Sequence, residues 1–195
     1  MRRHWRAVLA RNPHRRLVKL AAAAAAALFA VASGAAPPPG DSLETRILGG
    51  HNAARAQVGA PPLTWDPALA AGAAGWAQYL AGTGQFFHSD RKARRGIGEN
   101  LWMGTRGAYR IEDMTGMWDA EARNFVPGIF PNNSRTGSWM DIAHYSQVIW
   151  PATQRVGCAL AAGRSGDVLV CRYTPAGNID GRAVGYAPAP PALRR

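Results

Sequence analysis

The first 32 residues have the three-part pattern of an export signal, so the folded domain has to be built from the residues after position 32. Seven basic residues lie between Arg2 and Lys19, and no acidic residue precedes Asp41. The apolar run Leu20–Ala32 has 13 residues, which is too short for a membrane span of about 20 residues. A basic segment, an apolar segment and a small-residue site together form a secretory signal peptide. Ala30-Val31-Ala32 predicts cleavage after position 32.

Two alternatives for this segment stay open at the sequence level. The pair Arg15-Arg16 is compatible with twin-arginine export as well as the general route, and an uncleaved signal-anchor would use the same residues. We expect 33–42 to be a short Pro-containing linker. The domain itself is expected over 43–186, followed by a Pro-rich tail over 187–195.

The position of the basic residues changes what the net charge means. Seven of the 23 basic residues and none of the 12 acidic residues lie in the first 32 positions, so cleavage lowers the net charge from +11 to +4. We therefore expect a single secreted or periplasmic domain of 163 residues, a monomer with no nucleic-acid partner and no stable membrane span. Arginine outnumbers lysine 21 to 2, a composition typical of a GC-rich bacterial genome.

The periodicity of the mature chain predicts an α+β domain. Asp66 followed by Pro67 is a strong helix start, with an N-cap acid and proline at the first helical position. Helices that precede and flank a small antiparallel sheet define this fold class. Four helices, one short strand and a hairpin are expected at Leu43–Val58, Pro67–Leu80 with Gly82 and Gly84 as the stop, Ile111–Phe125, Ile142–Trp150, Ile97–Met103, and Arg155–Leu160 with Val168–Tyr173.

The two cysteines fall within this predicted hairpin. Cys158 and Cys171 lie in two apolar-rich segments bounded by Gly163, Gly166 and Pro175. Export to an oxidising compartment permits a disulfide between them, which would close a loop of about 14 residues. Two buried free thiols are the alternative.

Two acidic residues are placed where water is scarce. Glu121 lies one helical turn after Trp118, beside an apolar face, and Glu99 lies in a near-apolar stretch. A poorly solvated carboxylate needs cations, hydrogen-bond donors or a metal. His88 and His144 could supply these partners.

Several segments of the chain resemble the signatures of the CAP superfamily, which contains cysteine-rich secretory proteins, antigen 5 and plant pathogenesis-related class 1 proteins. The resemblance covers nearly the whole mature chain, with the motifs in the family order. The matching segments are Phe87-His88-Ser89, Gly98-Glu99-Asn100-Leu101, Trp118-Asp119-Ala120-Glu121, His144-Tyr145-Ser146-Gln147-Val148-Ile149-Trp150 and Cys171-Arg172-Tyr173-Thr174-Pro175-Ala176-Gly177-Asn178.

The resemblance implies a three-layer α–β–α sandwich with a cleft where His88, Glu99, Glu121 and His144 converge. It implies that the two histidines bind a divalent cation, most often zinc, with the glutamates nearby. Two nitrogen ligands are fewer than the three protein ligands of catalytic zinc, so we expect weak binding. The sequence departs from the family pattern at Arg172, where asparagine is frequent. We expect this departure to touch none of the four site residues.

Three functions compete at this level. The first is a non-enzymatic, allergen-like binding module that takes a hydrophobic ligand such as a sterol or fatty acid, with tryptophans lining the pocket. The second is a hydrolase, in which a metal-bound water is activated by Glu99 or Glu121, or in which Ser89 or Ser146 is the nucleophile of a Ser-His-Glu protease. Binding to nucleic acid or membrane through net charge is the third, and the location of the basic residues argues against it.

Overall fold

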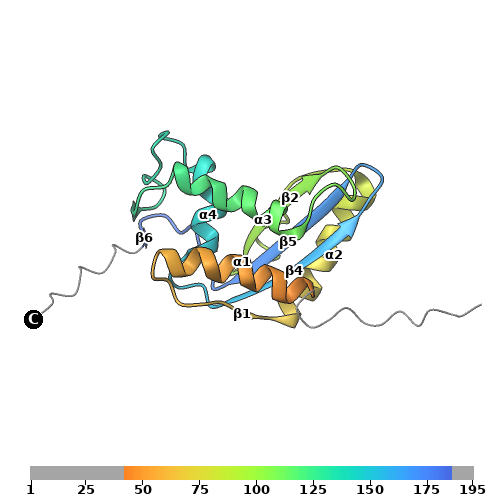
Figure 1. Ribbon diagram of the computed structural model, residues 1–195, viewed down its shortest axis with the longest axis horizontal. Coiled ribbons are helices and arrows are strands. Elements are labelled where there is room, and N and C mark those ends of the chain that lie inside the picture. Colours follow the sequence, from red (N-terminus) through yellow and green to blue (C-terminus); the bar gives the residue numbers. More distant parts are fainter. Residues whose placement is uncertain (1–41, 186–195) are drawn as a thin grey trace, which may run out of the picture. The chain divides into compact units, whose positions relative to one another are not determined.

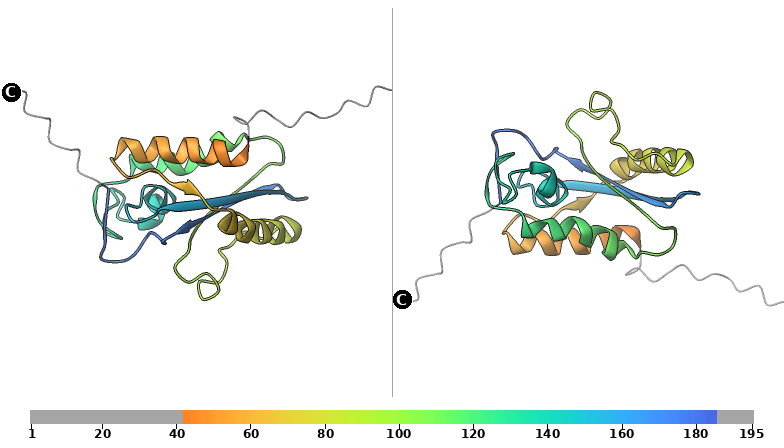
Figure 2. Two further views of the ribbon diagram at one scale, coloured as in Figure 1. Left: turned by 90° about the horizontal axis from the view of Figure 1, so that it is seen from below. Right: turned by 90° about the horizontal axis from the view of Figure 1, so that it is seen from above.

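Two helices cover one face of a four-stranded sheet, and a third covers the other face (Figures 1 and 2). This computed structural model describes residues 42–185. The helices α1 (Leu43–Gln57) and α3 (Ile111–Asp119) lie together on one side, and α2 (Pro67–Thr83) lies on the other. The expected α–β–α sandwich is confirmed. The signal peptide over 1–32, nearly all of the linker and the tail over 187–195 lie outside the described residues.

The sheet is antiparallel except at one edge. Its strand order is β1-β4-β5-β2, and β1 runs parallel to β4 through Thr64 and Trp65. The sequence does not reveal this strand, because two residues are too few to show an alternating pattern. The four strands are β1 (Thr64–Trp65), β2 (Gly98–Gly104), β4 (Arg155–Ala162) and β5 (Asp167–Thr174).

Helix α2 begins and ends as its local sequence predicts, with one exception. The Asp66 side chain accepts hydrogen bonds from the backbone N–H groups of Ala68 and Leu69, at 2.9 and 3.1 Å. Gly84 ends the helix in the left-handed conformation, with φ of 69°, which costs glycine little. Gly82 does not stop the helix, because α2 continues to Thr83.

The third predicted helix is broken in two, and the fourth is shorter than predicted and follows a 3-10 helix. Helix α3 ends at Asp119 and continues as the 3-10 helix η2 (Ala120–Arg123). The segment before Trp150 consists of the 3-10 helix η3 (Trp139–Ile142) and α4 (Ala143–Val148). The strand β3 (Gly128–Ile129) lies between η2 and η3 in the sequence. It pairs with β6 (Ala183–Val184) in a second, two-stranded sheet that the sequence does not reveal.

The predicted hairpin and its disulfide are both present. Cys158 on β4 and Cys171 on β5 are direct register partners and are joined by a disulfide. Residues on the two faces of the sheet form separate apolar clusters. The larger includes Ile47 and Trp118 under α1 and α3, and the smaller includes Leu80 under α2.

A buried arginine holds α4 at the end of the sheet. Arg55 on α1 is 0% exposed, and its guanidinium donates to the carbonyl oxygens of Val148, Trp150 and Thr153 at 2.8, 2.9 and 3.0 Å. These carbonyls lie at the carboxyl end of α4 and just beyond it. Arg55 thereby fixes the helix that carries His144.

Candidate functional site

Glu99 on β2 is a buried carboxylate surrounded by donors. Its side chain is 0% exposed. Oε1 accepts hydrogen bonds from the Ser89 N–H at 2.9 Å and from His88 Nδ1 at 3.0 Å, while Oε2 accepts from the Ser89 hydroxyl at 2.6 Å. An ionised carboxylate only accepts hydrogen bonds, so Nδ1 of His88 carries the proton. The partner that Glu99 needs is therefore supplied in part by the segment 88–89.

Two arginines complete the surroundings of Glu99. Arg94 Nε lies 3.7 Å from Oε1, and Arg172 Nε lies 3.5 Å from Oε2. Burial on its own would raise the pKa of Glu99, but hydrogen bonds from His88 and Ser89 and the charge of Arg94 lower that pKa to about 2. The expectation that Arg172 touches none of the four site residues is wrong. The two arginines and the two donors together keep Glu99 charged.

Glu121 on η2 and His144 on α4 form a second pair. Glu121 Oε1 accepts a 2.6 Å hydrogen bond from His144 Nδ1, and Oε2 accepts from the backbone N–H groups of His144 and Tyr145 at 2.9 and 3.0 Å. The His144 ring also stacks on Trp118, with centroids 5.9 Å apart and planes 12° apart. The break between α3 and η2 allows Glu121 to reach the first turn of α4.

Consecutive residues of β2 connect these two pairs. Glu99 faces the side of α2, and the next residue, Asn100, donates to the carbonyl oxygen of His144 at 3.1 Å. The structure thus joins the four predicted residues as two His–Glu pairs. Over residues 42–185, no group of three or more His, Cys, Asp or Glu side chains is arranged to hold a metal. In both pairs Nδ1 is engaged by the carboxylate.

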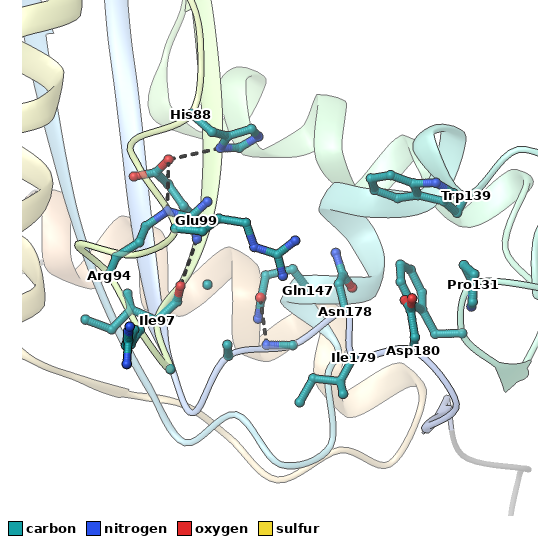
Figure 3. A pocket seen from close by; sticks show the side chains of 17 residues that line it. His88, Arg94, Ile97, Glu99, Pro131, Trp139, Gln147, Asn178, Ile179 and Asp180 are labelled. Carbon is teal, nitrogen blue, oxygen red and sulfur yellow. Dashed lines mark hydrogen bonds and ion pairs between the residues drawn. The ribbon is translucent and has the colours of Figure 1, made fainter.

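A cleft of about 820 Å³ opens beside the first pair and contains His88 and Glu99 in its lining. Figure 3 shows its arrangement: Arg94 and Ile97 lie on the same side as His88, while Trp139, Pro131 and Asp180 lie opposite. Gln147 and Asn178 lie between the two sides. Glu121 and His144 do not line this cleft.

The predicted nucleophile Ser146 is held in a structural role. It is 0% exposed, and its hydroxyl lies 3.2 Å from the Ala143 carbonyl oxygen and 2.7 Å from Asn178 Oδ1, with both atoms acting as acceptors. Gln147 Oε1 accepts from the Gly177 N–H at 2.9 Å, and Gln147 Nε2 donates to the Thr153 hydroxyl oxygen at 3.3 Å. The side chains of this signature therefore serve to hold α4 against the loop after β5.

The tryptophans expected to line a hydrophobic pocket are mostly core residues. Trp102, Trp118 and Trp150 are buried, and of the six in the mature chain only Trp139 lines the cleft. A second groove of about 320 Å³ lies between α1 and α3 and contains Asp119. Burial and the charge of Glu121 raise the pKa of Asp119 to about 6.

Four residues that matter to this site were not predicted as part of it: Ser89, Arg94, Asn100 and Arg172. Ser89 was considered only as a nucleophile, whereas its hydroxyl donates to Glu99. Arg94 lies in a charged run that resembles an ordinary solvated loop, and only its small exposed fraction, 12% of the side chain, distinguishes it. Asn100 lies in one of the family motifs and Arg172 is a departure from the family pattern, but neither feature indicates a contact with the site, and the contact of Arg172 with Glu99 depends on the register of β2 against β5.

Comparison with known proteins identifies the family and agrees with the fold. The profile of the family described as "CAP: Cysteine-rich secretory protein family" matches residues 48–173. Pathogenesis-related protein 1C of Nicotiana tabacum is 36% identical over 138 residues, covering 70% of this chain and 77% of that protein. The crystal structure of NaASP2 with Zn²⁺ is similar with a TM-score of 0.65 and 25% identity, over 80% of this chain and 92% of that one.

A venom allergen-like protein shares the fold at lower identity. The structure of Schistosoma mansoni venom allergen-like protein 4 has a TM-score of 0.57 and 23% identity, over 75% of this chain and 95% of that one. No helix within residues 42–185 is long and apolar enough to cross a membrane. The profile match and the identity to a pathogenesis-related protein establish that this chain belongs to the CAP, or cysteine-rich secretory protein, family.

Proposed function

We propose that this chain is a secreted, bacterial, non-enzymatic binding module in which His88 and His144 bind a divalent cation, with zinc the preferred ion. The observation that carries the proposal is the shared geometry of the two His–Glu pairs. In each, Nδ1 donates to a carboxylate, which orients the ring and leaves Nε2 as the nitrogen for a metal. Metal-binding histidines are held in this way by an outer carboxylate.

The chemistry of the donors suits weak zinc binding. Neutral imidazole nitrogens are good ligands for zinc, and Glu99 and Glu121 serve as the outer carboxylates. Only two protein nitrogens are offered, fewer than the three protein ligands of a catalytic zinc site. The similar structure of NaASP2 is described with Zn²⁺, which supports the same ion here. We therefore expect an exchangeable ion.

The non-enzymatic part of the proposal rests on the state of the candidate catalytic groups. Glu99 has a pKa of about 2, and a general base works best with a pKa near the working pH. The Ser89 hydroxyl donates to Glu99 rather than to a histidine, which leaves it without an activating base. Glu121 is the remaining candidate base, and the same residue holds the first turn of α4.

Calorimetric titration of zinc into metal-free protein tests the cation site. We expect about one zinc ion per chain, and a loss of affinity of at least tenfold in His88→Ala and in His144→Ala. The matched control is Arg123→Ala, an exposed residue outside the cleft, which should bind zinc like the parent. Unchanged zinc binding in the double histidine variant would refute the proposal.

Turnover assays test the hydrolase alternative. Peptide, ester and glycan substrates should show no turnover above the rate of His144→Ala. A rate that exceeds this control and requires zinc would establish the enzyme instead.

A hydrophobic ligand has one structural feature in its favour, the apolar side of the cleft with Phe130, Trp139 and Ile179. Mass spectrometry of the secreted protein should then find a co-purifying sterol or fatty acid that Trp139→Ala loses. The same sample reports export, because we expect its first residue to be Ser33.

A further inference from the structure

We propose that the cleft binds an acidic sugar, with the sugar ring against Trp139 and its carboxylate between Arg91 and Arg95. The inference rests on the proposed function only in treating the cleft as a ligand site. It does not require the cation.

The basic wall of the cleft consists of Arg91, Arg94 and Arg95, all of which line it. Arg94 is committed to the protein, since Nε donates to the Ser89 carbonyl oxygen at 3.2 Å and Nη1 donates to the Ile97 carbonyl oxygen at 2.9 Å. These bonds close the loop that carries the other two arginines. Arg91 and Arg95 are exposed, and neither has a side-chain hydrogen bond or ion pair to another residue in the described range.

The carboxylate nearest to this wall does not neutralise it. Glu99 lies in the same lining, but Arg94 and Arg172 already share its charge at 3.7 and 3.5 Å. Burial lowers the pKa of Arg94, and the charges of Arg91 and Arg172 lower it further, while the charge of Glu99 raises it. An anion that enters the cleft would therefore meet two arginines with free donors. Arginine binds a carboxylate through two parallel hydrogen bonds.

Pro131 and Trp139 lie opposite Arg94 (Figure 3), and together with Phe130, which also lines the cleft, they form what we call the aromatic wall. Trp139 is 46% exposed, although a large apolar side chain is normally buried. Phe130 meets it edge to face, with ring centroids 5.9 Å apart, which fixes the orientation of the indole. An exposed, oriented indole that lines a polar cleft is suited to packing against the C–H face of a sugar ring.

The remaining polar side chains of the cleft differ in whether they are available to a ligand. Gln147 and Asn178 use their amides within the protein, in bonds to Gly177, Thr153, Ser146 and Ala143. Asp180 lies beside the aromatic wall, and in the described range its side chain has no hydrogen bond or ion pair. A carboxylate there accepts hydrogen bonds from sugar hydroxyls and repels the acid group of the ligand toward Arg91 and Arg95. One ligand class satisfies both walls, a uronic acid.

Two probes that share their sugar rings and differ at the carboxyl groups give the sharpest test. Hexagalacturonate and its methyl ester carry the same rings, and the ester lacks the carboxylate charges. Calorimetry of the secreted protein in EDTA and 50 mM NaCl should show binding of hexagalacturonate, and the ester should bind at least tenfold more weakly. Raising NaCl to 500 mM should also weaken the acid, because salt screens exposed charges.

Matched variants locate the site. Arg91→Gln/Arg95→Gln should weaken hexagalacturonate at least tenfold, while Arg123→Gln/Arg164→Gln, which removes the same charge from exposed positions outside the cleft, should stay within twofold of the parent. Trp139→Ala should also lose at least tenfold.

Three results would overturn the inference: no binding of hexagalacturonate, equal binding of its methyl ester, or equal losses in the two arginine pairs. Zinc titration of the same preparations separates it from the proposed function. If zinc binds through the histidines and the sugar does not bind, only this inference fails.

Discussion

Arg172 and Glu99 lie directly opposite each other in the β5–β2 ladder, and Arg172 Nε is 3.5 Å from Glu99 Oε2. Opposite residues of an antiparallel pair project from the same face of the sheet. The register of these two strands therefore sets the contact, and it brings a cation to a carboxylate that water does not reach.

Arg172→Asn should destabilise the domain by about 1–3 kcal/mol, because it leaves a buried carboxylate with fewer partners. Urea unfolding at pH 7 measures the loss. The matched control is Arg155→Asn, which breaks the 3.4 Å pair between Arg155 and Asp66. That arginine side chain is 57% exposed, and exposed pairs contribute about 0–1 kcal/mol. Equal losses in the two variants would show that Arg172 does not support Glu99.

The pH dependence of stability should contain opposing contributions from Glu99 and Asp119. The pKa of Glu99 is lowered to about 2 in the fold, so its contribution is present above pH 4.5 and is lost as the pH falls toward 2. The pKa of Asp119 is raised to about 6. The folded state therefore favours protonated Asp119, and stability is gained as the pH falls from about 6 to 3.8.

Asp119→Asn isolates the second contribution. The variant should be more stable than the parent by about 1–2 kcal/mol at pH 7, since burial disfavours the charged form. The two proteins should converge near pH 3.5, where the carboxyl of the parent is protonated in both states. Urea unfolding over this range gives the difference, and Asp113→Asn, at an exposed position on the same helix, is the control that should not change with pH in this way. A constant difference would contradict the raised pKa.

Local sequence signals predicted the elements that form from nearby residues. Asp66 and Pro67 give the start of α2, because the cap and the fixed proline angle act within one turn. Cys158 and Cys171 lie in apolar segments bounded by glycines, which gave the hairpin and its bridge. The spacing of Trp118 and Glu121 placed an acidic residue beside an apolar face, which correctly indicated that it needs a partner.

Contacts set by register and by changes of helix type were not predictable. Periodicity carries the third helix through Phe125, whereas the structure changes to a 3-10 helix at Ala120, and Glu121 in that 3-10 helix accepts hydrogen bonds from the first turn of α4. Arg172 reaches Glu99 only through strand register. The family pattern identified the four site residues by position, but it did not show that they would form two separate pairs.

A buried hydrogen-bond chain should couple the core to the backbone of His144. The Tyr173 hydroxyl lies 2.9 Å from His51 Nε2 and 3.3 Å from Asn100 Nδ2, and Asn100 also donates to the His144 carbonyl. Burial lowers the pKa of His51 to about 4, so the ring is neutral in the fold. The free energy of unfolding therefore decreases as the pH falls from 6.5 toward 4, because the unfolded chain then binds a proton at His51 that the folded chain does not.

Tyr173→Phe removes the hydroxyl and leaves His51 and Asn100 with a lost partner. The expected cost is about 1–3 kcal/mol, the penalty for an unsatisfied buried polar group. Thermal and urea unfolding measure it against Tyr79→Phe, a variant of an exposed tyrosine that should change stability by less than about 0.5 kcal/mol. If Tyr173→Phe is as stable as this control, the chain of hydrogen bonds does not stabilise the fold.

Gln147 requires glycine at position 98. A Cβ at Gly98 would collide with Gln147 Oε1, and that oxygen already accepts from the Gly177 N–H at 2.9 Å. Gly98→Ala should therefore cost about 1–3 kcal/mol by overpacking. Urea unfolding of the parent, Gly98→Ala, Gln147→Ala and the double variant gives a double-mutant cycle for the free energy of unfolding. In the Gln147→Ala background the alanine at 98 should cost less than about 0.5 kcal/mol, because the colliding atom is gone.

Gly75→Ala is the matched control for this cycle. Gly75 lies within α2, with open space where the side-chain carbon of an alanine would lie, so alanine there should stabilise the helix by about 0.5–1 kcal/mol. The free energy of unfolding should fall in Gly98→Ala and rise in Gly75→Ala, and this difference separates steric collision from helix and strand propensity. An equal cost of Gly98→Ala in the presence and absence of the Gln147 side chain would place its effect in the backbone of β2, and Gln147 would then not be the residue that excludes a side chain at position 98.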